Sequence, residues 1–336
     1  MNTEEYIDSL LKQFPVYSLS EEEKRVIQKS GINYFINSKV FSNKFRKSAP
    51  TESFRNDIEK RIKLTLENNK PIRFTIPTGG YKKWQLKTAP EVDWSEFFHI
   101  RFMLEYFSPL LTVYKPGVIL DYYSNSWLIK AISYYPQDDI DTYTNSFKLL
   151  IEYFSVFFPS NLKIRYKIVT DQVPEKQLIE RILKNRPLVE SEINSLNEIE
   201  QKELFKYSER NIRWDILEKN GALFQDDKNK IIREGKIIHD CLLKGGWNSD
   251  LDYLKTDNAI PIIHRNSDPF FLHLASCAGS FVQFWVGTGI LKQEKDKYIP
   301  QILSYNQYQS VQKNLKKIPL STIKLKNFSH IELNRT

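Results

Sequence analysis

The chain has 336 residues, 41% of them hydrophobic and 27% charged, which is the composition of a soluble globular protein with one large or two ordinary domains. No apolar run reaches about 18 residues and no signal peptide is visible, so we expect no membrane span. The net charge of +8 favours anionic partners such as phosphorylated metabolites or nucleic acid. The two cysteines, Cys241 and Cys277, make no disulfide framework, and we expect a reduced, cytoplasmic protein.

The first 68 residues (1–68) are predicted to form an N-terminal helical segment. Apolar side chains recur at helical spacing from Thr3 onward, after Ser20, and again from Glu52 to Asn68. The acidic residues Glu21 to Glu23 favour a helix start after Ser20, because carboxylates are stabilised at the positive end of the helix dipole. We expect these helices to pack against the sheet that follows.

Residues 69–170 have the pattern of a Rossmann-like α/β core. A β-branched run from Ile72 to Ile76 precedes a loop with two glycines and two lysines. An aromatic helix is predicted from Trp94 to about Phe107, followed by a second strand from Val118 to Tyr123 and a third from Trp127 to Tyr134. Strands that alternate with helices indicate a layered α/β fold.

The loop after the first strand is the main candidate for a ligand site. The predicted order of strand, loop and helix places it at the carboxyl end of a strand, where open α/β sheets bind ligands. Glycines let the backbone approach a ligand, and lysines supply charge for a phosphate or a carboxylate. The loop matches neither G-x-x-x-x-G-K-[ST] nor G-x-G-x-x-G, and a type II turn followed by solvated lysines is the alternative. The candidate residues are Thr78, Gly79, Gly80, Tyr81, Lys82 and Lys83.

Three carboxylates follow this loop in the sequence. Asp93 and Glu96 have the spacing of a capping box with Asp93 as N-cap, so we interpret both mainly as helix-stabilising residues. Pro109 is expected to weaken the end of the same helix. Asp121 lies near the carboxyl end of the second predicted strand, where it either faces a ligand or is a surface residue.

The rest of the chain is predicted as two further segments. Residues 171–246 are helical and highly charged, and Lys244-Gly245-Gly246 has the form of a helix C-cap. Residues 247–336 are rich in predicted strands and complete the core. These strands are Ala259 to His264, Phe270 to Ser276 and Ser280 to Val286 as a hairpin, Tyr298 to Leu303, and Ile318 to Leu325.

Other kinds of chemistry have little support in the sequence. The five histidines have no metal-binding spacing and no CxxC motif occurs, so we predict no metal site. No G-x-S-x-G motif occurs, and Cys277 is interpreted as a small buried residue. Lys163, Arg165 and Lys167 alternate with apolar residues in a strand predicted from Leu162 to Val169, and this thin basic stripe leaves nucleic acid open as a partner.

The stretch from Pro71 to Tyr123 resembles the isocyanide (isonitrile) synthase family of pyoverdine and dityrosine biosynthesis. In that family a strand with the pattern pI.f.LP leads to a loop that holds a lysine, and a P..aE segment then opens a helix. The pattern continues with iY.PG, a strand that ends near an aspartate and, later, an R.SIH strand. The counterparts here are Pro71 to Pro77, Lys82 and Lys83, Pro90 with Ser95-Glu96, Tyr114-Lys115-Pro116-Gly117, Asp121, and Ile260 to His264.

The resemblance implies an enzyme with a Rossmann-like core and no metal or other cofactor. It implies that the amine of an amino acid condenses with a pentulose phosphate to form an isonitrile, so the partners are small molecules and not a membrane. Lys82 or Lys83 would hold the phosphate or form an imine. His264 and Asp121 would transfer protons. Arg265, which follows His264, is a further candidate for phosphate binding.

Two departures from the family pattern fall where substrate would bind. The family's loop reads LPAFPxKS, whereas this chain has Ile-Pro-Thr-Gly-Gly-Tyr-Lys-Lys-Trp, and Ser124-Asn125-Ser126 replaces the family's SDG. The same fold with different substrates or chemistry is therefore one expectation. The alternatives are a phosphate-handling nucleotide or sugar transferase that uses the same loop, and a non-catalytic nucleic-acid- or protein-binding module.

Overall fold

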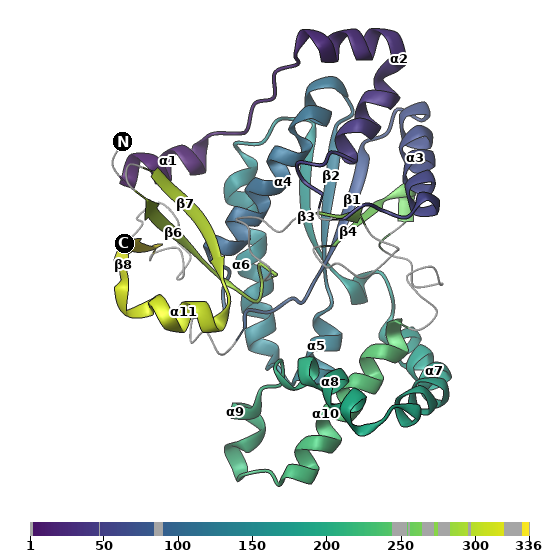
Figure 1. Ribbon diagram of the computed structural model, residues 1–336, viewed down its shortest axis with the longest axis vertical. Helices are drawn as coiled ribbons and strands as arrows, with labels where there is room; N and C mark the ends of the chain where they lie inside the picture. Colours follow the sequence, from purple (N-terminus) through teal and green to yellow (C-terminus); the bar gives the residue numbers. More distant parts are fainter. Residues whose placement is uncertain are drawn as a thin grey trace.

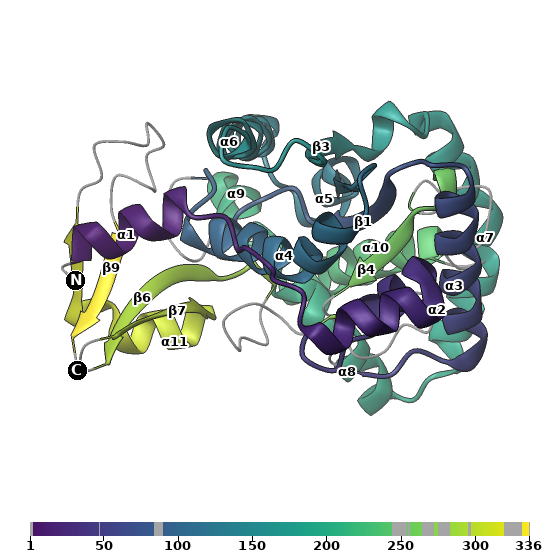
Figure 2. The same cartoon turned by 90° about the horizontal axis from the view of Figure 1, so that it is seen from above.

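The computed structural model describes residues 3–46, 48–83, 90–243, 254, 256–263, 272–274, 283–294, 297–318 and 331–335. Within these residues the chain forms a layered α/β structure with two sheets (Figures 1 and 2). A five-stranded parallel sheet lies at the centre, and a four-stranded sheet lies to one side of it, next to helix α4 (Trp94–Val113). The predicted α/β fold class is confirmed.

The central sheet has the strand order β3-β2-β1-β4-β5, and all its pairings are parallel. The chain passes outward from β1 through β2 to β3, and then returns to the other side of β1 for β4 and β5. Ligands of open α/β sheets bind at such a reversal, beyond the carboxyl ends of the strands. The strands are β1 (Ile72–Thr78), β2 (Val118–Ser124), β3 (Leu162–Ile168), β4 (Ile260–Ile263) and β5 (Leu272–His273).

The side chains of the central sheet alternate between two faces that differ in polarity. Phe74, Leu120 and Ile164 lie side by side in register on one face and belong to the main hydrophobic core with α4 and α6 (Gln137–Ser155). Arg73 and Asp121 project to the opposite face, as expected from the period of two in a strand. The sheet therefore has an apolar face toward α4 and α6 and a face with charged side chains on the other side.

Some helices cover the sheet, and others form a separate group below it in Figure 1. That group comprises α7 to α10, and α10 packs against α5 and α7. The helices are α1 (Thr3–Lys12), α2 (Glu21–Val40), α3 (Glu52–Glu67), α4 (Trp94–Val113), α5 (Ser126–Ser133), α6 (Gln137–Ser155), α7 (Glu175–Ser195), α8 (Glu198–Glu209), α9 (Trp214–Leu217), α10 (Gln225–Leu243) and α11 (Tyr305–Val311).

The N-terminal helices form where the sequence predicts them. Ser20 and Glu23 make the capping box that starts α2, and Thr51 caps α3. Helix α3 packs against β1, as expected. Helix α1 lies instead beside the second sheet and α4 (Figure 2), where the Tyr6 hydroxyl donates a hydrogen bond to the carbonyl of Tyr298 at 2.9 Å.

The second sheet has the order β7-β6-β9-β8 and contacts the first turn of α4 through β6. Gly289 makes this contact, because a Cβ atom there would clash with the backbone of Trp94 and Ser95. The sheet therefore sits directly against the start of α4. Its strands are β6 (Thr288–Glu294), β7 (Lys297–Leu303), β8 (Leu315–Ile318) and β9 (Ile331–Arg335).

Two predictions within the core are wrong. Trp127 to Tyr134 is not a strand, because Ser126–Ser133 forms α5; a short apolar run does not distinguish a strand from a buried helix. The aromatic helix, predicted to end at about Phe107, continues past Pro109 to Val113 as α4. The carbonyl of Glu105, which would have accepted a bond from residue 109, instead accepts one from the Ser108 hydroxyl at 2.9 Å.

The predicted hairpin near the C-terminal end is also wrong in its described part. Leu272 and His273 pair in parallel with Ile262 and Ile263, and residues 284–286 form a turn. Residues 275–282, the Lys244-Gly245-Gly246 cap and most of the predicted last strand lie outside the described residues. The strand predicted from Tyr298 and the helix capped by Ser304 are confirmed as β7 and α11.

Candidate functional site

The glycine-lysine loop leaves the carboxyl end of β1, beside the point where the strand order reverses. Thr78, the last residue of β1, pairs with Ser124 and donates a hydrogen bond to the carbonyl of Tyr123 at 3.3 Å. Gly80 has a φ of 74°, and a Cβ there would clash with the Ser124 hydroxyl. Glycine is therefore required at this position, because the loop bends in the left-handed region directly over β2.

Lys82 lies inside the protein in a cluster with two carboxylates. Its Nζ atom is 3.0 Å from Asp93 Oδ1 and 3.0 Å from each carboxylate oxygen of Glu96. It also donates hydrogen bonds to Ser95 Oγ at 2.7 Å and to the Phe284 carbonyl at 3.2 Å. The side chain is 1% exposed, so the alternative of a solvated lysine does not hold for this residue.

Glu96 is the member of this cluster whose protonation changes near neutral pH. Burial raises the pKa of its carboxyl to about 7. The positive charge of Lys82 opposes this rise, and the neighbouring Asp93 carboxylate adds to it. The Tyr143 hydroxyl donates a hydrogen bond to Glu96 Oε1 at 3.1 Å. A carboxyl with a pKa near 7 beside a buried lysine is suited to proton transfer.

Asp93 and Glu96 also form the predicted capping box of α4. The Asp93 carboxylate accepts a hydrogen bond from the Ser95 N–H at 2.7 Å, and Glu96 accepts one from the Asp93 N–H at 2.7 Å. The capping geometry is thus confirmed. The same two carboxylates also hold Lys82, so their role extends beyond the helix end.

Lys83 has a different environment from its neighbour. Its side chain is half-buried and makes no hydrogen bond or ion pair among the described residues. Burial lowers the pKa of its ammonium group, and the charge of Arg210 lowers it further. Arg210 is the C-cap residue of α8, so the helical group supplies it. Two cations from separate elements that approach one another favour an anion in the same place.

Asp121 belongs to an ion-pair network on the opposite face of the sheet. Arg73 Nε lies 2.6 Å from Asp121 Oδ2, Arg165 Nη2 lies 2.8 Å from it, and Lys167 Nζ lies 3.5 Å from it. Burial alone would raise the pKa of Asp121, but the Arg165 hydrogen bond and the Arg73 charge hold it below its ordinary value. The side chain is fully buried.

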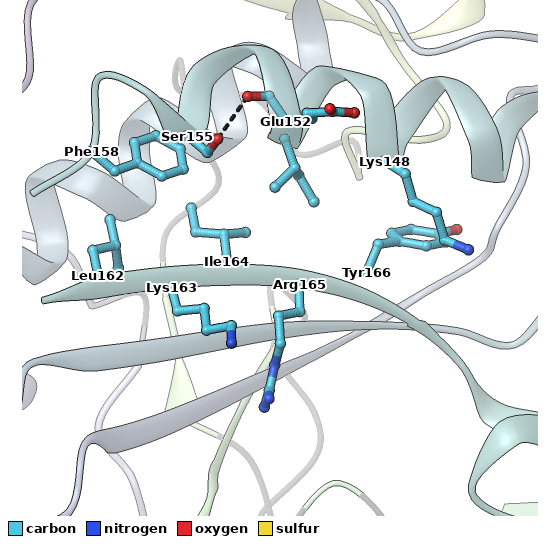
Figure 3. A pocket seen from close by; sticks show the side chains of 10 residues that line it. Lys148, Glu152, Ser155, Phe158, Leu162, Lys163, Ile164, Arg165 and Tyr166 are labelled. Atoms are coloured by element: carbon cyan, nitrogen blue, oxygen red, sulfur yellow. Dashed lines mark hydrogen bonds between the residues drawn. The ribbon is translucent and has the colours of Figure 1, made fainter. Parts of the chain in front are cut away.

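The prediction that Asp121 lies near the carboxyl end of its strand is therefore corrected, and so is the alternative that it is a surface residue. Asp121 is in the middle of β2, paired with Thr75 and Arg165, on the face that turns away from α4 and α6. Figure 3 shows the same alternation in β3, where Ile164 points toward α6 and Arg165 points away from it. The structure does not bring Asp121 and Lys82 together, because they lie on opposite faces.

Two predicted residues, His264 and Arg265, lie outside the described residues. Tyr81 is buried, and its ring packs against that of Tyr135 with centroids 4.5 Å apart. In the part of the chain that the structure describes, no three His, Cys, Asp or Glu side chains are grouped to hold a metal ion. None of the helices described there has the length and apolar character to cross a membrane.

The described fold is similar to that of a solved structure. The chain shares the fold of the PvcA protein from Pseudomonas aeruginosa. The two structures match with a TM-score of 0.58 and 13% sequence identity, over 89% of this chain and 100% of PvcA. No protein-family model and no curated protein sequence matches the chain significantly. The comparison with PvcA therefore shows a shared fold.

Sequence reasoning missed several members of the Lys82 cluster. Asp93, Ser95 and Glu96 follow the loop closely in the sequence. Two carboxylates at a helix start, soon after two lysines, were the signal that could have predicted the ion pairs with Lys82. Tyr143 comes from α6, and Phe284 is 202 residues from Lys82 in the sequence. No local pattern predicts these two contacts, because they arise only when α6 and the segment before β6 pack against α4.

Proposed function

We propose that this chain is a small-molecule biosynthetic enzyme of the isonitrile synthase kind, which condenses the amine of an amino acid with a pentulose phosphate. The observation that carries the proposal is the buried Lys82–Glu96 pair at the carboxyl edge of the sheet, with the pKa of Glu96 near 7. The fold is that of PvcA, a pyoverdine-cluster isocyanide synthase, and this supports the assignment.

The first chemical step requires proton transfer at neutral pH. The amine nitrogen attacks the ketone carbon and gives up its two protons, the carbonyl oxygen takes up two protons, and the C–O bond breaks to release water as the imine forms. Glu96, protonated or ionised in comparable amounts near pH 7, gives up and regains the protons of this step. Lys82 holds the Glu96 carboxylate in place. His264, which lies outside the described residues, stays a second proton-transfer candidate from the sequence.

The phosphate of the sugar is assigned to Lys83 and Arg210. Lys82 is saturated by two carboxylates, a hydroxyl and a carbonyl, so it has little capacity left for a phosphate. Lys83 has neither a hydrogen bond nor an ion pair among the described residues and is approached by a second cation. A phosphate between these two side chains would relieve their mutual repulsion and form charge-assisted hydrogen bonds. Asp121 lies on the opposite face and is left out of the proposed site.

The direct test is to incubate the purified protein with each common amino acid and ribulose 5-phosphate, and to detect isonitrile by mass spectrometry. We expect product with at least one amino acid, and a loss of turnover of at least a hundredfold in Glu96→Gln. Glu105→Gln, an exposed carboxylate on the same helix, is the matched control and should retain wild-type turnover.

A separate binding experiment tests the phosphate site. Lys83→Ala and Arg210→Ala should each weaken the binding of ribulose 5-phosphate in calorimetry and leave that of the amino acid unchanged. Lys184→Ala, an exposed lysine of α7, is the control. No product with any amino acid, together with no binding of a sugar phosphate, would refute the proposed function.

A further inference from the structure

Strand β3 forms one edge of the central sheet, because β2 is the only described strand that pairs with it. In a parallel pair, the backbone N–H and C=O groups of alternate residues point to the partner strand, and those of the residues between them point away. The Val118 N–H of β2 donates to the carbonyl of Asn161 at 2.9 Å, and this bond fixes the alternation along β3. The residues whose backbone groups point outward are therefore Leu162, Ile164 and Tyr166. The N–H groups of Ile164 and Tyr166 have no hydrogen-bond partner in the part of the chain that the structure describes.

The space beside this edge is a groove of about 340 Å³, which α6 borders on one side (Figure 3). Five consecutive residues of β3, from Leu162 to Tyr166, line the groove. Successive side chains of a strand point to opposite faces, as Figure 3 shows for Ile164 and Arg165, so only a space along the edge itself can touch all five. The groove therefore lies where a further strand would pair with β3.

The two sides of the groove differ in polarity. On the side of α6, the side chains of Ile151, Phe158 and Ile164 form apolar surface. On the opposite side lie Lys163 and Arg165, whose side chains point away from α6 (Figure 3). A strand that entered the groove would thus meet apolar groups with one face and cations with the other.

The charged side of the groove has more cations than carboxylates. The cations of this face are Arg73, Lys163, Arg165 and Lys167, and the carboxylates that pair with them are Asp121 and Asp257. Lys163 is exposed and has no ion pair among the described residues. Lysine on an edge strand opposes pairing between copies of the same protein. Two β3 strands side by side would bring their cations together, so the charge disfavours a second copy and favours an acidic strand.

We propose that the edge of β3 binds an extended, acidic segment of a partner protein as an additional strand. The backbone of this segment would pair with the outward N–H and C=O groups of β3. Its side chains would alternate, with apolar ones toward Ile151 and Phe158 and acidic ones toward Lys163 and Arg165. The inference concerns a surface and does not depend on the proposed reaction.

The test uses a fluorescein-labelled peptide that alternates valine and glutamate over seven residues, the length of β3, with both ends blocked. Fluorescence anisotropy with the full chain should show saturable binding. Two further peptides carry methyl groups on the backbone nitrogens of either the valines or the glutamates. One of these two should bind at least about tenfold more weakly and the other should retain most of the affinity, because only alternate N–H groups of a strand face its neighbour.

Charge reversal at the edge tests the choice of an acidic partner. Lys163→Glu should weaken the valine-glutamate peptide about fivefold, and it should allow a valine-lysine peptide to bind, which the wild-type protein should not do. The melting temperature of this variant should stay unchanged, because Lys163 is exposed. Lys184→Glu, which changes an exposed lysine of α7, is the matched control and should keep the wild-type affinity.

Four results would overturn the inference. The first is no binding of the valine-glutamate peptide, and the second is equal affinity for it and both methylated peptides, since backbone pairing would then play no part. The third is binding of single-stranded oligothymidylate as tight as that of the peptide and equally weakened by Lys163→Glu, which would indicate a general anion-binding surface. The fourth is a dimer in sedimentation that Lys163→Glu strengthens, which would indicate that β3 pairs with a second copy of the chain.

Discussion

The Nζ atom of Lys82 lies 3.0 Å from both carboxylate oxygens of Glu96, and neither side chain is more than 1% exposed. This pair ties the loop after β1 to the first turn of α4. Lys83, the next residue, is thereby placed half-buried near Arg210 instead of inside the carboxylate cluster. Two consecutive lysines thus have separate roles, one that fixes the loop and one that is available to an anion.

Replacing Lys82 by methionine should strongly destabilise the protein. Loss of the cation leaves Asp93 and Glu96 buried without their counter-charge, and breaking a buried ion pair in this way costs about 3 to 5 kcal/mol. The free energy of unfolding is measured in urea. Lys83→Met is the matched control and should change it by less than about 1 kcal/mol, because Lys83 has no ion pair among the described residues. Equal effects of the two substitutions would contradict the distinction between them.

The raised pKa of Glu96 predicts a specific dependence of stability on pH. The folded state binds a proton at Glu96 up to about pH 7, whereas the unfolded chain releases it near 4.5. Between these values the folded state holds more protons, so Glu96 makes the free energy of unfolding fall as pH rises. Glu96→Gln should lack this contribution, and Glu105→Gln should keep it. Urea titrations from pH 4.5 to 8 measure the slopes, and identical slopes for wild type and Glu96→Gln would exclude the shifted pKa.

The two carboxylates that contact Arg73 should differ in their contribution to stability. Asp121 and Asp257 each lie 2.6 Å from the Arg73 guanidinium, but their side chains are 0% and 83% exposed. Asp121→Asn should lower the free energy of unfolding by about 3 kcal/mol, because it leaves buried cations without their counter-charge. Asp257→Asn should cost at most about 1 kcal/mol.

The loss of stability at low pH provides a second test of the Arg73–Asp121 pair. The pKa of Asp121 is lowered in the folded state, so its contribution is complete above its unfolded pKa and is lost as pH falls through the folded value. Asp121→Asn should therefore lose less stability on acidification than wild type. If the free energy of unfolding falls equally with acidification in wild type and in Asp121→Asn, Asp121 does not carry the expected charge.

Two glycines with positive φ distinguish backbone strain from steric fit. Gly31 and Gly80 have φ of 83° and 74°, but a Cβ at Gly31 meets nothing within 4 Å, whereas one at Gly80 clashes with the Ser124 hydroxyl. Gly31→Ala should cost about 1 to 2 kcal/mol from the left-handed backbone alone. Gly80→Ala should cost more, and Ser124→Gly in the same chain should restore part of the difference. Equal melting temperatures for the two single variants would refute the close approach.

Local chemistry in the sequence predicted the elements that local interactions determine. The capping boxes at Ser20, Asp93 and Ser304 mark helix starts, and the β-branched run from Ile72 marks the first strand. The two failures within the core also have physical reasons. The apolar run from Trp127 suits a strand or a buried helix, and packing against α10 made it a helix. Pro109 stayed within α4 because Ser108 satisfies the freed carbonyl.

The sequence by itself determined that a glycine-lysine loop follows the first strand and that two carboxylates open the next helix, since both depend on neighbours in the chain. Only the tertiary structure decided which lysine is buried, which carboxyl has a pKa near 7, and that Asp121 faces away from them. Burial and charge contacts set these properties. The groups that cause them, Tyr143, Phe284, Arg73 and Arg210, come from distant segments that meet only after the sheets and helices have packed.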